Sequence, residues 1–305
     1  MQPMTVINSF YRNPNALSYA TQLFSASSSV RTEAAVPSSW SRQDDQTPFT
    51  ESTGQKALAR IVEILALRDA SVEEGASVDE TLGYITGASG TEGEDKLTFD
   101  ARAVYNIDTG AGDDTVTAKA SALASISTGA GNDSLSASAS FISDLETGEG
   151  DDTLKLSGEL VMNVSGGDGN DTLTVAGEAL IGIDGGASDD TMTLEGTRIF
   201  ASGGTGNDTI SIKRTDMNAE NAVAEYGFAR GDGQDTINVN GSLKLRFAGY
   251  DEKDVSISVD GNTLTATFAG TSDRITVTLD QVALSGQGLT YGFAYDQGRT
   301  VLTIG

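Results

Sequence analysis

The stretch that decides the fold is Gly148-Glu-Gly150-Asp151-Asp152-Thr-Leu154, because variants of this phrase recur along the chain. Eight copies lie between Gly90 and Asn240. Their closing aspartates are separated by 19 residues five times, then by 18 and finally by 27. A fixed period of this kind over eight copies indicates a solenoid in which each repeat forms one coil. The closing aspartates are Asp95, Asp114, Asp133, Asp152, Asp171, Asp190, Asp208 and Asp235.

Each repeat has the residues that a turn followed by a strand requires. Two glycines separated by one residue allow positive φ or a close approach of backbones. Apolar residues then recur at every second position, which places them on one face of a strand. A further apolar position precedes each turn, so each period contains two strands that share one core. The three apolar positions are Val116, Leu135, Leu154, Leu173, Met192, Ile210 and Ile237; Ala118, Ala137, Leu156, Val175, Leu194, Ile212 and Val239; and Ile107, Ile126, Leu145, Val164 and Ile183.

Stacking the coils also aligns the aspartates. Carboxylates at the spacing of neighbouring strands repel one another unless a cation lies between them. Calcium accepts six to eight oxygen ligands from carboxylates and backbone carbonyls, and glycine-rich turns bring carbonyls close to the aspartates. Zinc and copper favour His or Cys ligands, and the chain has neither residue. The repeat therefore predicts calcium ions between adjacent turns.

The turns resemble the G-G-x-G-x-D-x-U-x repeats of RTX (repeats-in-toxin, haemolysin-type) calcium-binding proteins. The resemblance covers about half of the chain and implies a calcium-loaded β-roll. Together with the acidic and amide residues of the turns, it gives these candidate calcium ligands: Gly93, Asp95, Gly110, Gly112, Asp113, Asp114, Gly129, Gly131, Asn132, Asp133, Gly148, Gly150, Asp151, Asp152, Gly167, Gly169, Asn170, Asp171, Gly186, Asp189, Asp190, Gly204, Gly206, Asn207, Asp208, Gly231, Gly233 and Asp235.

This chain departs from the family pattern in its second half-coil. RTX proteins usually have two glycine-rich turns per coil, whereas segments such as 156–160 and 175–179 contain no such turn. We therefore expect calcium along one edge of the roll and ordinary turns along the other. Ser188 stands where the motif has a glycine, which weakens the expected site in that turn.

Composition narrows the classes of function. The net charge is −25, and residues 90–240 contain 27 Asp and Glu against 8 Lys and Arg. This charge argues against nucleic-acid binding, for which a basic patch is expected. The absence of His removes the commonest general base and any Ser-His-Asp arrangement. Carboxylate pairs suited to glycoside hydrolysis are better explained as parts of the aspartate row, so we expect no catalytic activity.

The N-terminal segments differ from the repeats in composition. Residues 1–54 are rich in Ser, Thr and Ala, which predicts a disordered or loosely attached arm. Residues 55–69 have the period of an amphipathic helix, and we expect this helix to cover the open end of the roll. A helix that binds a membrane surface or a partner is the alternative. Residues 70–89 read as an acidic linker or a first irregular coil. The start of the chain lacks the features of a cleavable secretion signal, and no apolar run is long enough for a membrane span.

The pattern of residues changes after the repeats. An insertion at 213–230 stretches the last spacing, and its Tyr226-Gly-Phe228 resembles a phrase near the end of many RTX arrays. Segments 243–247, 255–259, 264–268 and 275–279 alternate apolar and polar residues, which predicts half-buried antiparallel strands with a hairpin turn at 260–262. The resemblance implies that residues 241–305 form a β cap followed by an uncleaved signal for type I secretion.

The sequence thus predicts an all-β fold: a parallel β-roll or β-helix solenoid of about eight coils at 90–240, a C-terminal antiparallel β cap and a short N-terminal helix. The expected function is that of a secreted, non-enzymatic RTX protein whose roll folds on binding calcium. Two alternatives remain open. One is a calcium-dependent adhesin that attaches to a cell surface, a matrix or an extracellular polysaccharide, or that binds ice; the other is a metal-free acidic solenoid. Two ranks of hydroxyl side chains motivate the first: Thr115, Thr117, Ser134, Ser136, Thr153, Thr172, Thr174, Thr191, Thr193, Thr209 and Ser211, with Lys155 as an interruption.

Overall fold

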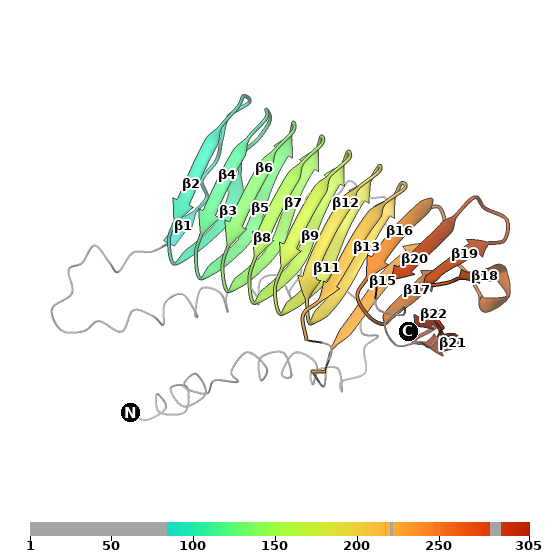
Figure 1. Ribbon diagram of the computed structural model, residues 1–305. Coiled ribbons are helices and arrows are strands. Elements are labelled where there is room, and N and C mark those ends of the chain that lie inside the picture. The colour runs from blue at the N-terminus through green and yellow to red at the C-terminus, as the bar shows by residue number, and fades with distance from the viewer. Residues whose placement is uncertain (1–83, 217, 220–221, 281–287) are drawn as a thin grey trace, which may run out of the picture. The chain divides into compact units, whose positions relative to one another are not determined.

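The computed structural model describes residues 84–216, 218–219, 222–280 and 288–305. In this part the chain winds into a parallel β-solenoid of about eight turns (Figure 1), as the period predicts. Two sheets of eleven strands each form its walls. The only helical element among the described residues is a single 3₁₀ turn, η4 (Glu252–Asp254). The predicted arm and the predicted helix at 55–69 lie outside the described residues.

Sheet A contains the longer strands of the coils. In spatial order they are β1 (Tyr84–Thr86), β3 (Ala103–Asp108), β5 (Ala122–Ala130), β7 (Phe141–Glu149), β9 (Leu160–Asp168), β11 (Ala179–Ala187), β13 (Arg198–Thr205), β15 (Val223–Ala229), β17 (Leu243–Ala248), β22 (Arg299–Ile304) and β21 (Tyr291–Asp296). Because β1 pairs in parallel with β3, part of the segment 70–89 already belongs to the first coil.

Sheet B contains the short strands that follow the glycine-rich turns. In spatial order they are β18 (Val255–Asp260), β19 (Thr263–Phe268), β20 (Arg274–Leu279), β16 (Gln234–Val239), β14 (Thr209–Arg214), β12 (Thr191–Gly196), β10 (Thr172–Ala176), β8 (Thr153–Ser157), β6 (Ser134–Ser138), β4 (Thr115–Lys119) and β2 (Lys96–Asp100).

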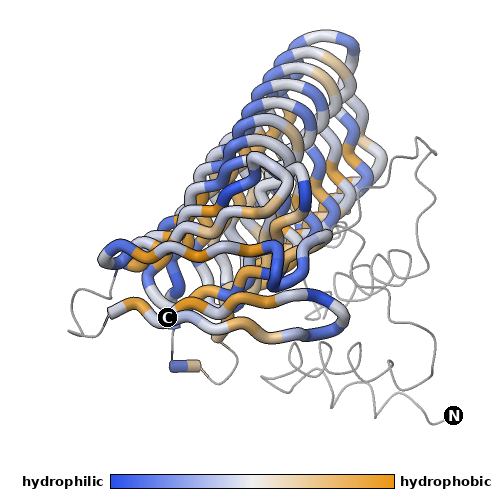
Figure 2. Tube along the Cα trace, turned by 90° about the vertical axis from the view of Figure 1, so that its right-hand side faces the viewer, coloured by the Kyte–Doolittle hydropathy of each residue, from blue (hydrophilic) through white to orange (hydrophobic). Residues whose placement is uncertain are grey.

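The core lies between the two sheets and consists of apolar residues stacked in register. Each residue pairs with its equivalent one repeat away, as Leu154 does with Leu135 and Leu173. All three apolar positions expected from the sequence are buried along the roll. Figure 2 shows that hydrophobic residues recur at matching places in successive coils. Each Val, Leu, Ile or Met side chain at these positions contributes about 1.5–3 kcal/mol when fully buried. Sheet A adds a fourth buried position that the sequence analysis did not identify: Val104, Leu123, Ile142, Val161, Leu180 and Ile199.

The change of spacing from 19 to 18 residues has a local cause in sheet A. Asn106, Ser125, Asp144 and Asn163 occupy one position of successive coils with φ between 51° and 56°, and Gly182 continues the series at φ 70°. Asn and Asp tolerate this left-handed conformation better than most residues. Strand β13 has no equivalent residue, so its register against β11 shifts between Ile181 and Ile183. The 19-residue coil is therefore an 18-residue coil with one added left-handed residue.

The longest spacing arises chiefly from the connection between β14 and β15. β14 ends at Arg214 and β15 begins at Val223, so most of the added residues lie between these two strands. Beyond this connection, β15 and β16 rejoin the parallel sheets. The insertion therefore extends one turn of the solenoid and leaves its two walls continuous.

The strands after 240 only partly follow the expectation of antiparallel pairing. β17 pairs in parallel with β15 and antiparallel with β22, and β20 pairs in parallel with β16 and antiparallel with β19. The prediction for 243–247 and 275–279 is thus wrong on one side of each strand. The reason is that β15 and β16, the preceding strands of the solenoid, each leave one edge open for a further parallel strand. The hairpin at 260–262, between β18 and β19, is confirmed.

Aromatic and charged contacts attach the C-terminal strands to the solenoid. Phe268 of β19 stacks on Phe228 of β15, with ring centroids 5.0 Å apart, and meets the edge of Phe247 of β17 at 5.1 Å. Arg246 of β17 forms ion pairs with Glu225 at 2.6 Å and with Asp296 of β21 at 3.0 Å. These contacts join β15, β17, β19 and β21 into one packed end. Among the described residues, no helix has the length and apolar character needed to cross a membrane.

Candidate functional site

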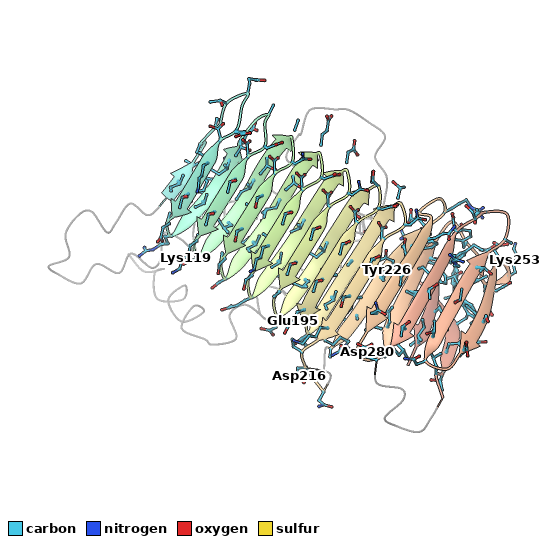
Figure 3. All side chains as sticks on the ribbon, turned by 45° about the horizontal axis from the view of Figure 1, so that its top comes forward. Lys119, Glu195, Asp216, Tyr226, Lys253 and Asp280 are labelled. Carbon is cyan, nitrogen blue, oxygen red and sulfur yellow. The ribbon has the colours of Figure 1, made fainter. Side chains whose placement is uncertain are left out.

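The glycine-rich turns stack on one edge of the solenoid. Lys119 and Glu195, at or next to the ends of β4 and β12, lie on the opposite edge (Figure 3). Their glycines have positive φ: Gly110, Gly112, Gly129, Gly131, Gly148, Gly150, Gly167, Gly169, Gly186, Gly204, Gly206, Gly231 and Gly233. At Gly129 an added Cβ would also collide with the carbonyl oxygen of Gly110 in the preceding coil. The motif glycines therefore permit both the turn and the close approach of successive turns.

Two turns depart from this geometry. Gly93 in the first turn does not have positive φ, and an added Cβ there would meet nothing within 4 Å. Ser188 adopts φ 87° in the place of a glycine and keeps the turn, since its N–H still donates to Thr205 at 2.7 Å. The serine thus preserves the backbone path that the motif glycine would take.

The eight closing aspartates form one continuous row, which we call the inner row. The backbone N–H of each aspartate from Asp95 to Asp208 donates to Oδ1 of the closing aspartate in the next coil. The first six links measure 2.7–2.9 Å, and the last, from Asp208 to Asp235, measures 3.2 Å. The sequence analysis correctly groups these residues, and each carboxylate already has one oxygen engaged by the protein.

The second carboxylate oxygen distinguishes the middle of the inner row from its ends. At the ends a hydroxyl group donates to Oδ2: Thr91 to Asp95 at 2.9 Å and Tyr226 to Asp235 at 2.7 Å. In the six middle aspartates Oδ2 is buried and has no hydrogen-bond partner among the described residues; we call these atoms the unpaired oxygens. They belong to Asp114, Asp133, Asp152, Asp171, Asp190 and Asp208, whose exposed fractions are 1–2%.

Burial makes the ionised inner row costly. Burial, and then the neighbouring carboxylates, raise the pKa of Asp171 to about 7 and that of Asp190 to about 8. Burial likewise raises the pKa of Asp208 to about 6. A backbone N–H opposes the rise in each case but does not cancel it. A buried acceptor without a donor costs roughly 1–3 kcal/mol, and more when it is charged. The row therefore requires protons or another cation.

The residue before each closing aspartate forms a second, exposed row, which we call the outer row. Acid and amide alternate along it: Asp113, Asn132, Asp151, Asn170, Asp189 and Asn207. Each side-chain Oδ1 from Asp113 to Asp189 accepts a backbone N–H of the next coil, at 2.7–3.1 Å. The amide groups of Asn170 and Asn207 also donate to the preceding aspartate. The alternation halves the charge of the row, and the backbone of the next coil satisfies one side-chain oxygen of each residue from Asp113 to Asp189.

The two rows do not converge into a cluster of acidic side chains. Within the described residues, no group of three or more Asp, Glu, His or Cys side chains could hold a metal ion by itself. A cation at this edge would instead take an unpaired oxygen together with backbone carbonyls of the adjacent coil. Such a donor set is entirely oxygen, which suits a hard cation such as calcium.

Carbonyl oxygens do approach the unpaired oxygens. Gly166 lies directly before the first glycine of its turn, and an added Cβ there would collide with both Asp171 Oδ2 and the carbonyl oxygen of Gly185. An added Cβ at Gly185 would likewise meet Asp190 Oδ2 and the carbonyl oxygen of Gly203. The space that these glycines leave is therefore bordered by a carboxylate and a carbonyl from adjacent coils, which fits a calcium ligand set.

The sequence analysis missed this position before the turn, and it missed the two hydroxyl groups at the ends of the row. The doubled glycine of Gly166-Gly167 is a signal that could have identified the position. Tyr226 could not have been paired with Asp235 from spacing, because the tyrosine lies in sheet A and Asp235 lies in sheet B, on the other side of the core.

No protein-family model matches this chain, and no curated protein matches it at a significant level.

Proposed function

We propose that this chain is a non-enzymatic calcium-binding β-roll protein of the RTX type, whose roll folds when calcium binds. The six unpaired oxygens carry this proposal, because they recur in consecutive coils, are buried, and have no donor among the described residues. One calcium ion per gap would neutralise the inner row and join adjacent turns through carboxylate and carbonyl oxygens. Magnesium suits these sites poorly, since it demands near-octahedral geometry and keeps its waters.

Calcium binding would then supply folding free energy. The described residues include many stacked carboxylates on one edge, which repel one another in the absence of a cation. A ligand that binds only the folded roll stabilises it in proportion to the logarithm of its concentration. The resemblance to RTX proteins further suggests export by type I secretion in an unfolded state, followed by folding in a calcium-rich exterior.

We also assign a capping role to the C-terminal antiparallel strands. β18 and β19 continue sheet B beyond its last parallel strand, and Phe268 packs against aromatic side chains of β15 and β17. An uncovered coil would offer an open edge for aggregation. The cap would end the parallel array at a fixed coil.

A count of bound calcium tests the proposal. Native mass spectrometry of the full chain in calcium should find about four to seven ions, with about six if each unpaired oxygen serves one site. Asp152→Asn should lower the number, whereas the matched control Asp151→Asn changes only the exposed outer row and should not. Absence of bound calcium in the wild-type chain would refute the proposal. Ten or more ions would show that both edges bind.

Attachment to an external surface is the second candidate function. The two hydroxyl ranks of sheet B face outward, and β16 and β20 extend them through Thr236 and Thr276. Lys155 interrupts the ranks, which weakens a regular match to a crystal surface. Calcium-dependent retention on cells or on a polysaccharide would support adhesion, and thermal hysteresis in calcium would support ice binding.

A further inference from the structure

The position before each turn's first glycine divides the six middle aspartates of the inner row into two halves. Gly90 has this position in the first coil, where Thr91 already donates to Asp95 Oδ2. In the coils of the six middle aspartates it is threonine three times, Thr109, Thr128 and Thr147, and then glycine three times, Gly166, Gly185 and Gly203. All six residues are buried. None of the three glycines has positive φ, so the backbone does not require glycine there. The difference between the halves is therefore a difference in what fills the space beside the aspartates.

In the threonine half, a hydroxyl group fills that space. Thr109, Thr128 and Thr147 each donate from Oγ1 to the carbonyl oxygen of the equivalent residue in the next coil, at 2.8, 3.0 and 2.5 Å. The carbonyl oxygen that would otherwise face the carboxylate thus already accepts a hydrogen bond. The threonine proton therefore partly replaces the positive charge that a bound cation would place beside this oxygen.

In the glycine half, the hydroxyl is missing and two acceptors face the same space. Asp171 Oδ2 and the carbonyl oxygen of Gly185 border the position that a Cβ of Gly166 would occupy, and Gly185 has the same arrangement with Asp190. Two oxygen acceptors without a donor between them repel each other. At Gly203 the phenol oxygen of Tyr226 takes the place of the carbonyl, and its proton goes to Asp235, so the series stops there.

We infer that the calcium row is graded: the coils of Gly166 and Gly185 bind calcium more tightly than the coils of Thr109, Thr128 and Thr147. This inference rests on the proposed function and names the residue that sets the affinity in each coil. Glycine leaves both oxygens free for the ion, whereas threonine fills the space and satisfies the carbonyl with a proton.

Exchange of the two residue types tests the grading. In calorimetric titrations with calcium alone, Gly166→Thr should weaken one tight site, and Thr147→Gly should create one. We expect changes of about 10- to 100-fold in affinity, the range typical of contacts that support a metal ligand. Thr147→Ser keeps the hydroxyl and is the matched control, for which the titration should stay as in the wild type. Native mass spectrometry at limiting calcium should show one ion fewer and one ion more in the two exchanged variants.

The outcomes separate this inference from the proposed function. A wild-type chain that binds no calcium would refute the proposed function. A wild-type chain that binds calcium, with unchanged titrations for both exchanged variants, would overturn only the grading. If Gly166→Thr does not fold in calcium, Thr147→Gly decides, because it only removes atoms at a position whose backbone suits either residue.

Discussion

Removing the Tyr226 hydroxyl should destabilise the C-terminal end of the inner row. Tyr226 is fully buried, and its hydroxyl donates to Asp235 Oδ2 at 2.7 Å while it accepts the N–H of Gly203 at 2.9 Å. Tyr226→Phe keeps the packed ring and deletes both contacts. Loss of a hydrogen bond to a charged group costs about 1.5–3 kcal/mol, and an unsatisfied buried N–H costs about 1–3 kcal/mol. Because one oxygen makes both contacts, we expect a combined loss of about 3–5 kcal/mol.

Urea unfolding in saturating calcium measures this loss. With a slope of about 2–3 kcal/mol per molar urea, the midpoint should fall by about 1–2.5 M. Tyr295→Phe is the matched control, because Tyr295 is 75% exposed and its hydroxyl removal should leave the midpoint unchanged. Equal midpoints for Tyr226→Phe and the wild type would refute the assignment of Tyr226 as the group that satisfies Asp235.

Three further predictions concern the same edge. Ser188→Gly should stabilise the roll by about 0.5–1 kcal/mol in urea unfolding, because Ser188 holds φ 87° and glycine removes that strain at a small entropic cost; a lower midpoint would contradict this. Burial raises the folded pKa of Asp171 to about 7 and that of Asp190 to about 8, against 3.8 in the unfolded chain, so without calcium the folded state binds protons more tightly. Stability without calcium should therefore fall as pH rises from about 4 to 8, and strand content in chelator should be higher at pH 5 than at pH 8. Higher strand content at pH 8 would contradict burial of these carboxylates as the cause. Asp171→Ala should raise the calcium concentration needed for folding more than Asp235→Ala does, because Asp235 Oδ2 already accepts a hydrogen bond from the Tyr226 hydroxyl. A larger effect at Asp235 would indicate that folding starts from the C-terminal strands.

The parts of the fold that were predictable follow from the period. Apolar residues such as Leu154 and Leu173 recur at one position of the repeat, and stacking at a fixed spacing places them in register whatever the detailed geometry. The left-handed position in sheet A was not predictable, because Asn106, Ser125 and Gly182 share a conformation but not a residue type. The parallel pairing of β17 depends on a vacant sheet edge beside β15, which the alternation of its own residues does not encode.

The residues of the candidate site were predictable from the sequence, but the contacts of their individual oxygen atoms were not. The sequence identifies the closing aspartates, yet only the structure distinguishes Oδ1, which accepts a backbone N–H, from Oδ2, which is unpaired in six coils of the described solenoid. It also separates the inner row from the outer row, although Asp151 and Asp152 are neighbours in sequence. The hydroxyls at the two ends could not be assigned from spacing, since Thr91 acts within its own turn and Tyr226 reaches across the core.

Circular dichroism with and without calcium tests the central claim most directly. The full chain at neutral pH should show a largely disordered far-UV spectrum in chelator and a strand-rich spectrum after calcium is added, and further chelator should reverse the change. Magnesium at the same concentration should not produce the strand signal. Identical spectra with calcium and with chelator would contradict the claim that calcium folds the roll.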